Sequence, residues 1–276
     1  MRQKITKIPM IPLAVLLTWA TASVHPGLAQ EPQPTFSSAA QAGQSLLQAA
    51  QHNDAQAIAK IVGGPTELAS SHDDAQDKLD RKLFVQKYQE MHRFGRNADG
   101  SSILYIGAEN WPFPVPIVEK KGAWRFDSDA GQKEILYRQI GEDELTAIAV
   151  CHDFVAAKHN RATPDIADAD SDLAARLAAK APSQSSDGEP MQFRGYYFRE
   201  LPMRQTNETR QETGKKTAGR FAMIAYPAEY RSSGVMTFVV TDSDVVYEKD
   251  LGANTSALAS AMAAFRRDAT WHAANE

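Results

Sequence analysis

Cysteine is almost absent from this chain of 276 residues, because Cys151 is the only one. A single thiol forms no internal disulfide, so an apolar core has to hold the fold, and a small disulfide-stapled scaffold is excluded. The chain also lacks a basic stripe of the kind that phosphate contacts require, since its 30 basic and 34 acidic residues are mixed along its length. We therefore expect no nucleic-acid partner.

Long apolar runs are missing after the first thirty residues. A membrane-spanning helix needs about 20 consecutive apolar residues, so we expect a soluble mature protein with no transmembrane segment. Residues 1–29 have the parts of a signal peptide: a basic start, an apolar run over Ile8–Ala20 and small residues at Gly27–Ala29. Cleavage after Ala29 leaves 276 − 29 = 247 residues, periplasmic if the host has an outer membrane and secreted otherwise. The rival interpretation, an uncleaved anchor, is weakened by an apolar run of only about 13 residues.

The familiar catalytic and metal-binding motifs are also absent. The sequence contains no glycine-rich phosphate loop, GxSxG, SxxK, HExxH or CxxC. His152 and His159 share a helical face, but seven residues separate them by roughly 10 Å, too far for one ion. Cys151 and His152 are helix neighbours that do not face each other. We therefore assign no catalytic, cofactor-binding or metal-ligating residue and treat these three as structural.

One aspartate run has the spacing of the first ligands of a calcium-binding loop. Asp168, Asp170 and Asp172 match loop positions one, three and five. Leu173 stands where the loop needs glycine, and Ala179 stands where it needs the bidentate glutamate. The sequence predicts no specific calcium loop here and leaves open whether the stretch binds an ion.

Residues 30–130 indicate an α+β subdomain, a helical hairpin on a small antiparallel sheet, with a pattern similar to cystatin-like or NTF2-like folds. We expect a third helix over Asp77–Phe94, with its apolar face at Leu79, Leu83, Phe84, Tyr88 and Met91. The run Trp111–Ile117 has proline at every second position, which removes the donors from one edge of a strand. That edge either blocks strand pairing or displays Trp111 and Phe113 as a docking surface.

The second half of the chain is predicted to contain a connecting helix and a second sheet. Residues 131–160 favour one helix or two, with a break at Gly141. Leu145 lies on one apolar arc of this helix and Val150 and Phe154 lie on the opposite one, so we expect the helix to lie between two layers. Residues 161–192 form a polar linker or insertion around a short helix. Residues 193–276 predict an antiparallel meander and a terminal helix that continues through Phe265. The fold class is therefore α+β.

The residues left over after this assignment are the candidates for a site. Glu229, Tyr230 and Arg231 lie in a corner between strands, where loops often carry function, and with Trp111 and Phe113 they form a candidate partner surface. Glu248 and Asp250 alternate along the last strand and share one face, so they form a candidate carboxylate pair.

Five motifs resemble the DUF2950 family of bacterial exported proteins. They are Trp111–Pro114, Gly195–Arg199, Phe221–Tyr230, Ser233–Phe238 and Val246–Gly252. The resemblance covers nearly all of the mature chain and implies export and a shared fold, but it transfers no catalytic residue because the family's function is unknown. The C-terminal half is also similar, more weakly, to the globular heads of type IV pilin-like proteins and pseudopilins.

Three functional hypotheses remain open on the sequence. The first is a non-catalytic interaction or assembly module of the cell envelope, with an unidentified envelope protein as its partner. The second is a periplasmic hydrolase that uses carboxylates such as Glu229, Glu248 or Asp250. The third is a carrier of a small apolar ligand, because helix-on-sheet folds can enclose a pocket. None of the three requires a cofactor.

Overall fold

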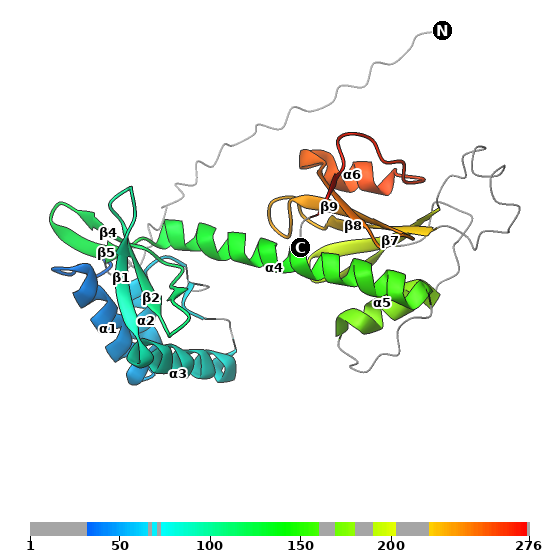
Figure 1. Cartoon of the computed structure of the whole chain (residues 1–276). Coiled ribbons are helices and arrows are strands. Elements are labelled where there is room, and N and C mark those ends of the chain that lie inside the picture. Colours follow the sequence, from blue (N-terminus) through cyan, green and yellow to red (C-terminus); the bar gives the residue numbers. More distant parts are fainter. Residues whose placement is uncertain are drawn as a thin grey trace, which may run out of the picture.

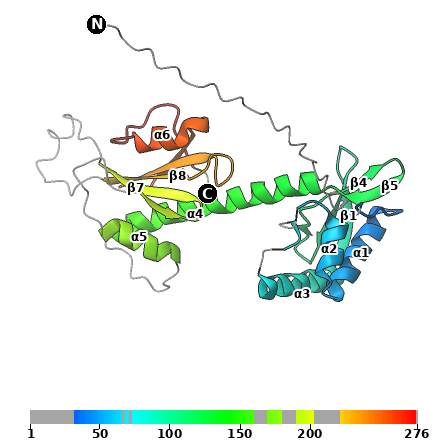
Figure 2. The ribbon, with the colours of Figure 1, turned by 180° about the vertical axis from the view of Figure 1, so that it is seen from behind.

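The computed structural model describes residues 32–65, 68–70, 73–159, 169–179, 190–202 and 221–274, arranged as two lobes on one long helix (Figure 1). The N-terminal lobe comprises residues 32–127. The C-terminal lobe contains the described residues between 169 and 274, and it packs against the second half of the helix (Figure 2). The expected signal peptide, residues 1–29, lies outside the described residues. The architecture confirms the α+β class.

Helices α1 (Ala39–Gln51) and α2 (Ala55–Val62) form the predicted helical hairpin of the N-terminal lobe. The Ser38 hydroxyl accepts a hydrogen bond from the Gln41 amide, and the Gln41 side chain accepts one from the Ser37 amide. These bonds satisfy amides that the first helical turn leaves unpaired. Asp54 plays the same role for α2 by accepting from the Ala57 amide at 2.9 Å. The start of each helix is thus fixed locally.

The sheet of the N-terminal lobe is antiparallel and carries the hairpin on one face. Its strands are β1 (His92–Arg96), β2 (Ser102–Ile106), β3 (Trp111–Pro112), β4 (Ile117–Lys120) and β5 (Ala123–Phe126). The order is β1-β2-β4-β5, with β3 paired to β2. Leu46, Ile58, Ile117 and Phe126 belong to the core between helices and sheet. This helix-on-sheet packing is the scaffold for the hollow described below.

Helix α3 (Asp74–Glu90) differs from the expected helix in both its end and its buried face. It stops before Met91, whose backbone is extended, because the next residues pair with β2 as strand β1. Leu79 and Leu83 are 60% and 52% exposed and Met91 is 38% exposed, so the predicted apolar face is wrong at those three positions. Phe84 and Tyr88 pack inward as predicted, and Asp77 joins them on the buried face.

The proline-rich run is a shorter strand than expected. Only Trp111 and Pro112 pair as β3, and Phe113 adds a backbone hydrogen bond from its amide to the Leu104 carbonyl at 2.8 Å. Phe113 lies between two prolines, so the donor that survives points to β2 while the prolines occupy the opposite edge. Ile117, expected at the end of the same strand, begins β4.

Helix α4 (Ser128–Lys158) is one unbroken helix of 31 residues, so the break expected at Gly141 is wrong. A methyl group at Gly141 would meet no atom within 4 Å, which means that no tertiary contact requires glycine there. Gly131, in contrast, lies against Val115 of the N-terminal lobe. Leu145 is 64% exposed, and the buried face is Ala147, Val150, Cys151, Phe154 and Val155.

Within the described residues, the sheet of the C-terminal lobe has six antiparallel strands in the order β11-β10-β9-β8-β7-β6. The strands are β6 (Met191–Phe193), β7 (Tyr196–Pro202), β8 (Phe221–Pro227), β9 (Met236–Thr241), β10 (Val246–Asp250) and β11 (His272–Ala273). Phe238 and Val240 pack toward α4, and Val239 packs on the other face, as their alternation predicts. Helix α5 (Ala169–Ala179), inside the segment expected as a polar linker or insertion, buries Leu173 and Leu177 in this core.

The outer face of this sheet is covered by η3 (Gly252–Asn254), α6 (Thr255–Ser260) and the segment that follows. Helix α6 is shorter than the terminal helix expected through Phe265. Arg199, only 7% exposed on β7, donates to the carbonyls of Ala259, Ser260 and Met262, which holds the helix end in place. Phe265 and Trp271 then pack edge to face over the sheet.

Candidate functional site

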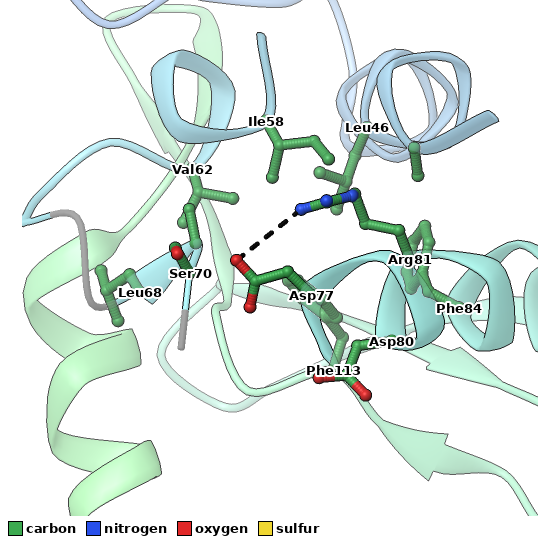
Figure 3. Close-up of a pocket in the computed structure, with 12 residues that line it drawn as sticks. Leu46, Ile58, Val62, Leu68, Ser70, Asp77, Asp80, Arg81, Phe84 and Phe113 are labelled. Atoms are coloured by element: carbon green, nitrogen blue, oxygen red, sulfur yellow. Dashed lines mark ion pairs between the residues drawn. The ribbon is translucent and has the colours of Figure 1, made fainter. Parts of the chain in front are cut away.

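A hollow of about 310 Å³ opens in the N-terminal lobe between α1, α2 and α3 (Figure 3). Most of its wall is apolar and comes from the three helices, the segment 68–70 and Phe113. The apolar lining consists of Leu46, Ala50, Ile58, Val62, Leu68, Ala69, Phe84 and Phe113. Pockets for small molecules are typically concave, apolar and about this large. The hollow is therefore the candidate functional site.

Two charged side chains of α3, Asp77 and Arg81, extend into this apolar hollow (Figure 3). They are four residues apart, which places them on one helical face with the acidic residue nearer the N-terminus, the favourable orientation for an ion pair. Arg81 Nη1 lies 3.9 Å from Asp77 Oδ2. Asp77 is 7% exposed, and its carboxylate lies in the first turns of α3, where the helix dipole favours negative charge.

The loop between α1 and α2 orients the arginine. Asn53 has a left-handed backbone, with φ of 52°, which asparagine tolerates better than most residues. Its Oδ1 accepts a hydrogen bond of 2.6 Å from Arg81 Nε. This bond ties α3 to the α1–α2 hairpin and holds the guanidinium at the wall of the hollow.

A second hollow of about 790 Å³ lies on the other side of Arg81. Ala50 and Arg81 line both spaces, so they form the wall between them. The second hollow is more basic, because Lys78 and Lys82 line it together with Leu79. This hollow runs along the outer side of α3, where Leu79 is exposed. The first hollow is the better candidate, because buried core residues such as Leu46 and Val62 line it and the Asp77–Arg81 pair lies in its wall.

The structure brings together two of the residues selected from the sequence, Tyr230 and Asp250. The Tyr230 hydroxyl donates to Asp250 Oδ2 at 3.1 Å, and the Gly252 amide donates to Oδ1 at 2.7 Å. Arg231 lies 5.4 Å above the Tyr230 ring. Glu229 is exposed beside them in the same corner. Asp250 therefore holds two loops together.

Glu248 shares a strand face with Asp250, as the alternation along β10 predicts, but its surroundings differ. It is half-buried and lies opposite Phe238 on β9 and His272 on β11. Asp250 is exposed and engaged by Tyr230. The two carboxylates thus have separate environments along the strand.

Trp111 and Phe113 lie in the other lobe, so the candidate partner surface is divided. Trp111 is 44% exposed and lies beneath Arg138 of α4, whose guanidinium is 5.1 Å from the ring centre. Phe113 is half-buried, packs against Phe84 and Phe126, and lines the hollow. Phe113 is the one residue shared by the sequence-based surface and the structural site.

The histidines and the cysteine of α4 have packing contacts. Burial raises the pKa of the Cys151 thiol well above its usual range, and the nearby Asp244 carboxylate adds to this effect. His152 Nδ1 lies 2.8 Å from Asp244 Oδ1, and His159 packs against Phe221. Of the aspartate run, Asp168 lies outside the described residues, while Asp170 and Asp172 fall within α5. No cluster of metal-ligating side chains occurs within the described part of the chain.

The sequence matches one protein family over nearly its whole described length. The family model, described as a protein of unknown function (DUF2950), matches residues 33–184 and 166–274. The chain belongs to the DUF2950 family. No curated protein and no solved structure matches it. None of the helices in the described ranges of this DUF2950 protein is long and apolar enough to cross a membrane.

Sequence reasoning missed the polar pair at the centre of this DUF2950 protein's hollow. The available signal was the spacing of Asp77, Arg81, Phe84, Val85 and Tyr88, which places an acid and a base in line with an apolar stripe. Leu79 and Leu83 compete with that stripe and point to a different face. A charged pair at i, i+4 is more often found on a solvated helix face, so the spacing alone does not indicate a pocket.

Proposed function

We propose that this DUF2950 protein is an exported binding protein for a small, largely apolar molecule held in the hollow of its N-terminal lobe. The observation that carries the proposal is an apolar space of about 310 Å³ with an ion pair between the buried Asp77 and the half-buried Arg81 in its wall. Apolar walls supply affinity by removing ligand surface from water, and a few fixed polar groups supply orientation. Both components are present here.

The size of the hollow limits the ligand. At roughly 30 Å³ for each atom of water size, a ligand of about ten heavy atoms fills it. A molecule of this size reaches dissociation constants between about 1 µM and 1 mM at ordinary ligand efficiencies. The proposed role is therefore reversible carriage or sensing of an abundant small molecule.

The proposal is tested with 1-alkanols of increasing chain length, measured by isothermal titration calorimetry on the purified mature chain. Each added methylene contributes about 0.8 kcal/mol, or roughly fourfold in affinity, as long as it enters an apolar space. We expect this gain to stop near eight carbons, where the hollow is full. Absence of saturable binding across the series would contradict the proposal.

A matched pair of variants locates the binding site. Ala69→Leu places a larger side chain at the wall of the first hollow and not of the second, and it should shorten the best-binding alcohol by two or three carbons. Ala149→Leu makes the same change on the exposed face of α4 and should leave the series unchanged. If both variants bind every alcohol as the wild type does, the ligand lies elsewhere.

Export is a separate part of the proposal, supported by the basic, apolar and small-residue pattern of residues 1–29. The intact mass of the protein isolated from the cell envelope should correspond to residues 30–276. Recovery of the full-length chain from the cytoplasm alone would show that this part is wrong.

A second candidate function is the envelope interaction or assembly module, and α4 favours it. One helix of 31 residues is about 46 Å long and contributes packed residues to both lobes, as a spacer would. Photo-crosslinking residues at Tyr230 and Trp111 should then capture one reproducible envelope protein, while Leu258, exposed on α6, serves as the control position. Capture of the same protein from Tyr230, Trp111 and the control position Leu258 would contradict a specific interaction surface.

A further inference from the structure

We propose that the ligand of the N-terminal hollow carries no net charge and has a head group that both donates and accepts hydrogen bonds, with a primary amide as the best fit. This inference rests on the proposed binding function and specifies its ligand class. Its basis is the pairing of Asp77 with Arg81 inside an apolar wall. The opposite charges of this pair limit the chemistry of whatever lies beside them.

The pair leaves room for a bridging group. Arg81 Nη1 and Asp77 Oδ2 are 3.9 Å apart, close enough for attraction but longer than a direct N–H···O hydrogen bond. Both side chains extend from one helix, so the helix backbone sets their separation. A small head group can therefore contact both partners at once without breaking a hydrogen bond between them.

Arg81 retains hydrogen-bonding capacity toward the hollow. A guanidinium has five N–H donors, and its Nε–H is taken by Asn53. Among the described residues, the other contact of its charged group is the 3.9 Å ion pair with Asp77. Asp77 has a further partner of its own, but a carboxylate offers about four acceptor positions. One side of the hollow thus donates and the other accepts.

Charge balance decides between ligand classes. Asp77 and Arg81 cancel each other, and Asp80 adds a carboxylate at the exposed margin that already accepts a bond from Gln76. A ligand carboxylate would meet Asp77 at close range, and a ligand ammonium would meet Arg81. A buried charge without its own partner is costly, whereas a neutral head leaves the balance intact.

A primary amide satisfies both partners simultaneously. Its carbonyl oxygen accepts from Arg81, and its NH₂ group donates to Asp77, so both charged groups gain a hydrogen bond. A hydroxyl can also accept from Arg81 and donate to Asp77, but both hydrogen bonds then involve one oxygen and their directions fit the two partners less well. Hydrogen bonds to charged groups are the stronger ones, which makes the head group the main source of selectivity.

The test compares octanamide, 1-octanol, octanoate and octylammonium, which share one apolar chain, by titration calorimetry on the mature protein. We expect octanamide to bind at least tenfold more tightly than octanoate or octylammonium, with octanol between them. Octanoate or octylammonium binding as tightly as the amide overturns the inference while leaving the binding function intact. If none of the four binds, the proposed function itself fails.

A single substitution should invert the selectivity. Asp77→Asn removes the negative charge and leaves the Arg81 guanidinium in place, so octanoate should gain about tenfold and become the tighter ligand. Lys78→Met, which removes a charge that lines only the second of the two hollows described, is the matched control and should preserve the wild-type order. Should Asp77→Asn not fold, Arg81→Gln serves instead and should weaken octanamide about tenfold. An unchanged order in the folded variant overturns the inference.

Discussion

Both lobes of the protein are built on antiparallel sheets, but other elements cover one face of the sheet in the N-terminal lobe and both faces in the C-terminal lobe. Strand β2 of the N-terminal lobe alternates between buried and half-buried residues, so one of its faces is covered. Strand β8 of the C-terminal lobe is buried at six successive positions, from Ala222 to Pro227, because α4 and α5 cover one face and α6 covers the other. The C-terminal lobe is a filled sandwich, whereas the N-terminal lobe retains space.

Under the proposed binding function, the filled lobe supplies stability and the hollow lobe supplies the binding site. The filled lobe has aromatic and aliphatic side chains in continuous contact, and a buried arginine satisfies the end of its outer helix. The hollow lobe keeps a charged pair beside an unfilled apolar space. The side chains that line this space lack the dispersion contacts that a fully packed core would give them. We interpret the C-terminal lobe as the anchor of α4 and the N-terminal lobe as the part that binds.

The largest expected effect comes from removing the buried arginine of the filled lobe. Arg199→Met leaves the carbonyls of Ala259, Ser260 and Met262 without their donor, and we expect the free energy of unfolding to fall by about 2–4 kcal/mol. Urea denaturation followed by tryptophan fluorescence measures the change. Arg194→Met, at an exposed turn of the same lobe, should change stability by no more than about 0.5 kcal/mol.

Next in size is a substitution at the contact between α4 and the hollow lobe. A methyl group at Gly131 would lie 2.7 Å from Val115 Cγ2, and a buried valine has little rotamer freedom to move away. Gly131→Ala should therefore lower the free energy of unfolding by about 1–2 kcal/mol. Loss of alcohol binding together with stability would show that this contact also shapes the hollow.

The same substitution ten residues later should have the opposite sign. A methyl group at Gly141 meets no atom within 4 Å, so Gly141→Ala should gain helix propensity and raise stability by about 0.5–1 kcal/mol. Thermal unfolding followed by circular dichroism measures both variants. Destabilisation by Gly141→Ala would mean that α4 bends there in solution and that the two lobes move relative to each other.

The sequence predicts the local features of this fold well and the hollow poorly. Ser38, Asp54 and the alternating faces of β9 follow from hydrogen-bonding and periodicity rules that act over a few residues. Gly141 predicts a helix break because the cost of glycine in a helix follows from the sequence, whereas the packing of α4 against both lobes, which keeps the helix continuous, does not. The end of α3 at β1 likewise depends on pairing with β2, which is a tertiary contact.

The candidate site illustrates the same limit from the other direction. Phe113 was selected for its place among prolines, and the structure puts it in the wall of the hollow. Asp77 and Arg81 were not selected, because the space beside them exists only where α1, α2 and α3 meet. A space that remains where separate helices pack incompletely does not change the periodicity of any one helix, so the sequence pattern does not reveal it. Tyr230 is a candidate from the sequence only because no core or turn role accounts for it, and in the structure its hydroxyl contacts Asp250 and holds a loop in place.

The smallest expected effect concerns a carboxylate of α4 beside the filled lobe. Burial raises the pKa of Asp143 above its ordinary value of 3.8, the nearby Glu142 raises it further, and Arg194 partly offsets both. A raised pKa means that the folded state holds this proton more tightly than the unfolded state. The resulting stability is fully present below pH 3.8 and is lost as the pH rises through the folded-state pKa.

At pH 7 the ionised Asp143 therefore costs stability, and Asp143→Asn should raise the free energy of unfolding by about 0.5 kcal/mol or less. The gain should shrink as the pH falls below the folded-state pKa, because the wild-type side chain is then neutral as well. Urea titrations at pH 7 and at pH 4 measure both values. Arg194→Met removes the offsetting charge and should enlarge the difference at pH 7. A gain that does not change with pH would come from packing. It would contradict the prediction that ionisation of Asp143 opposes folding.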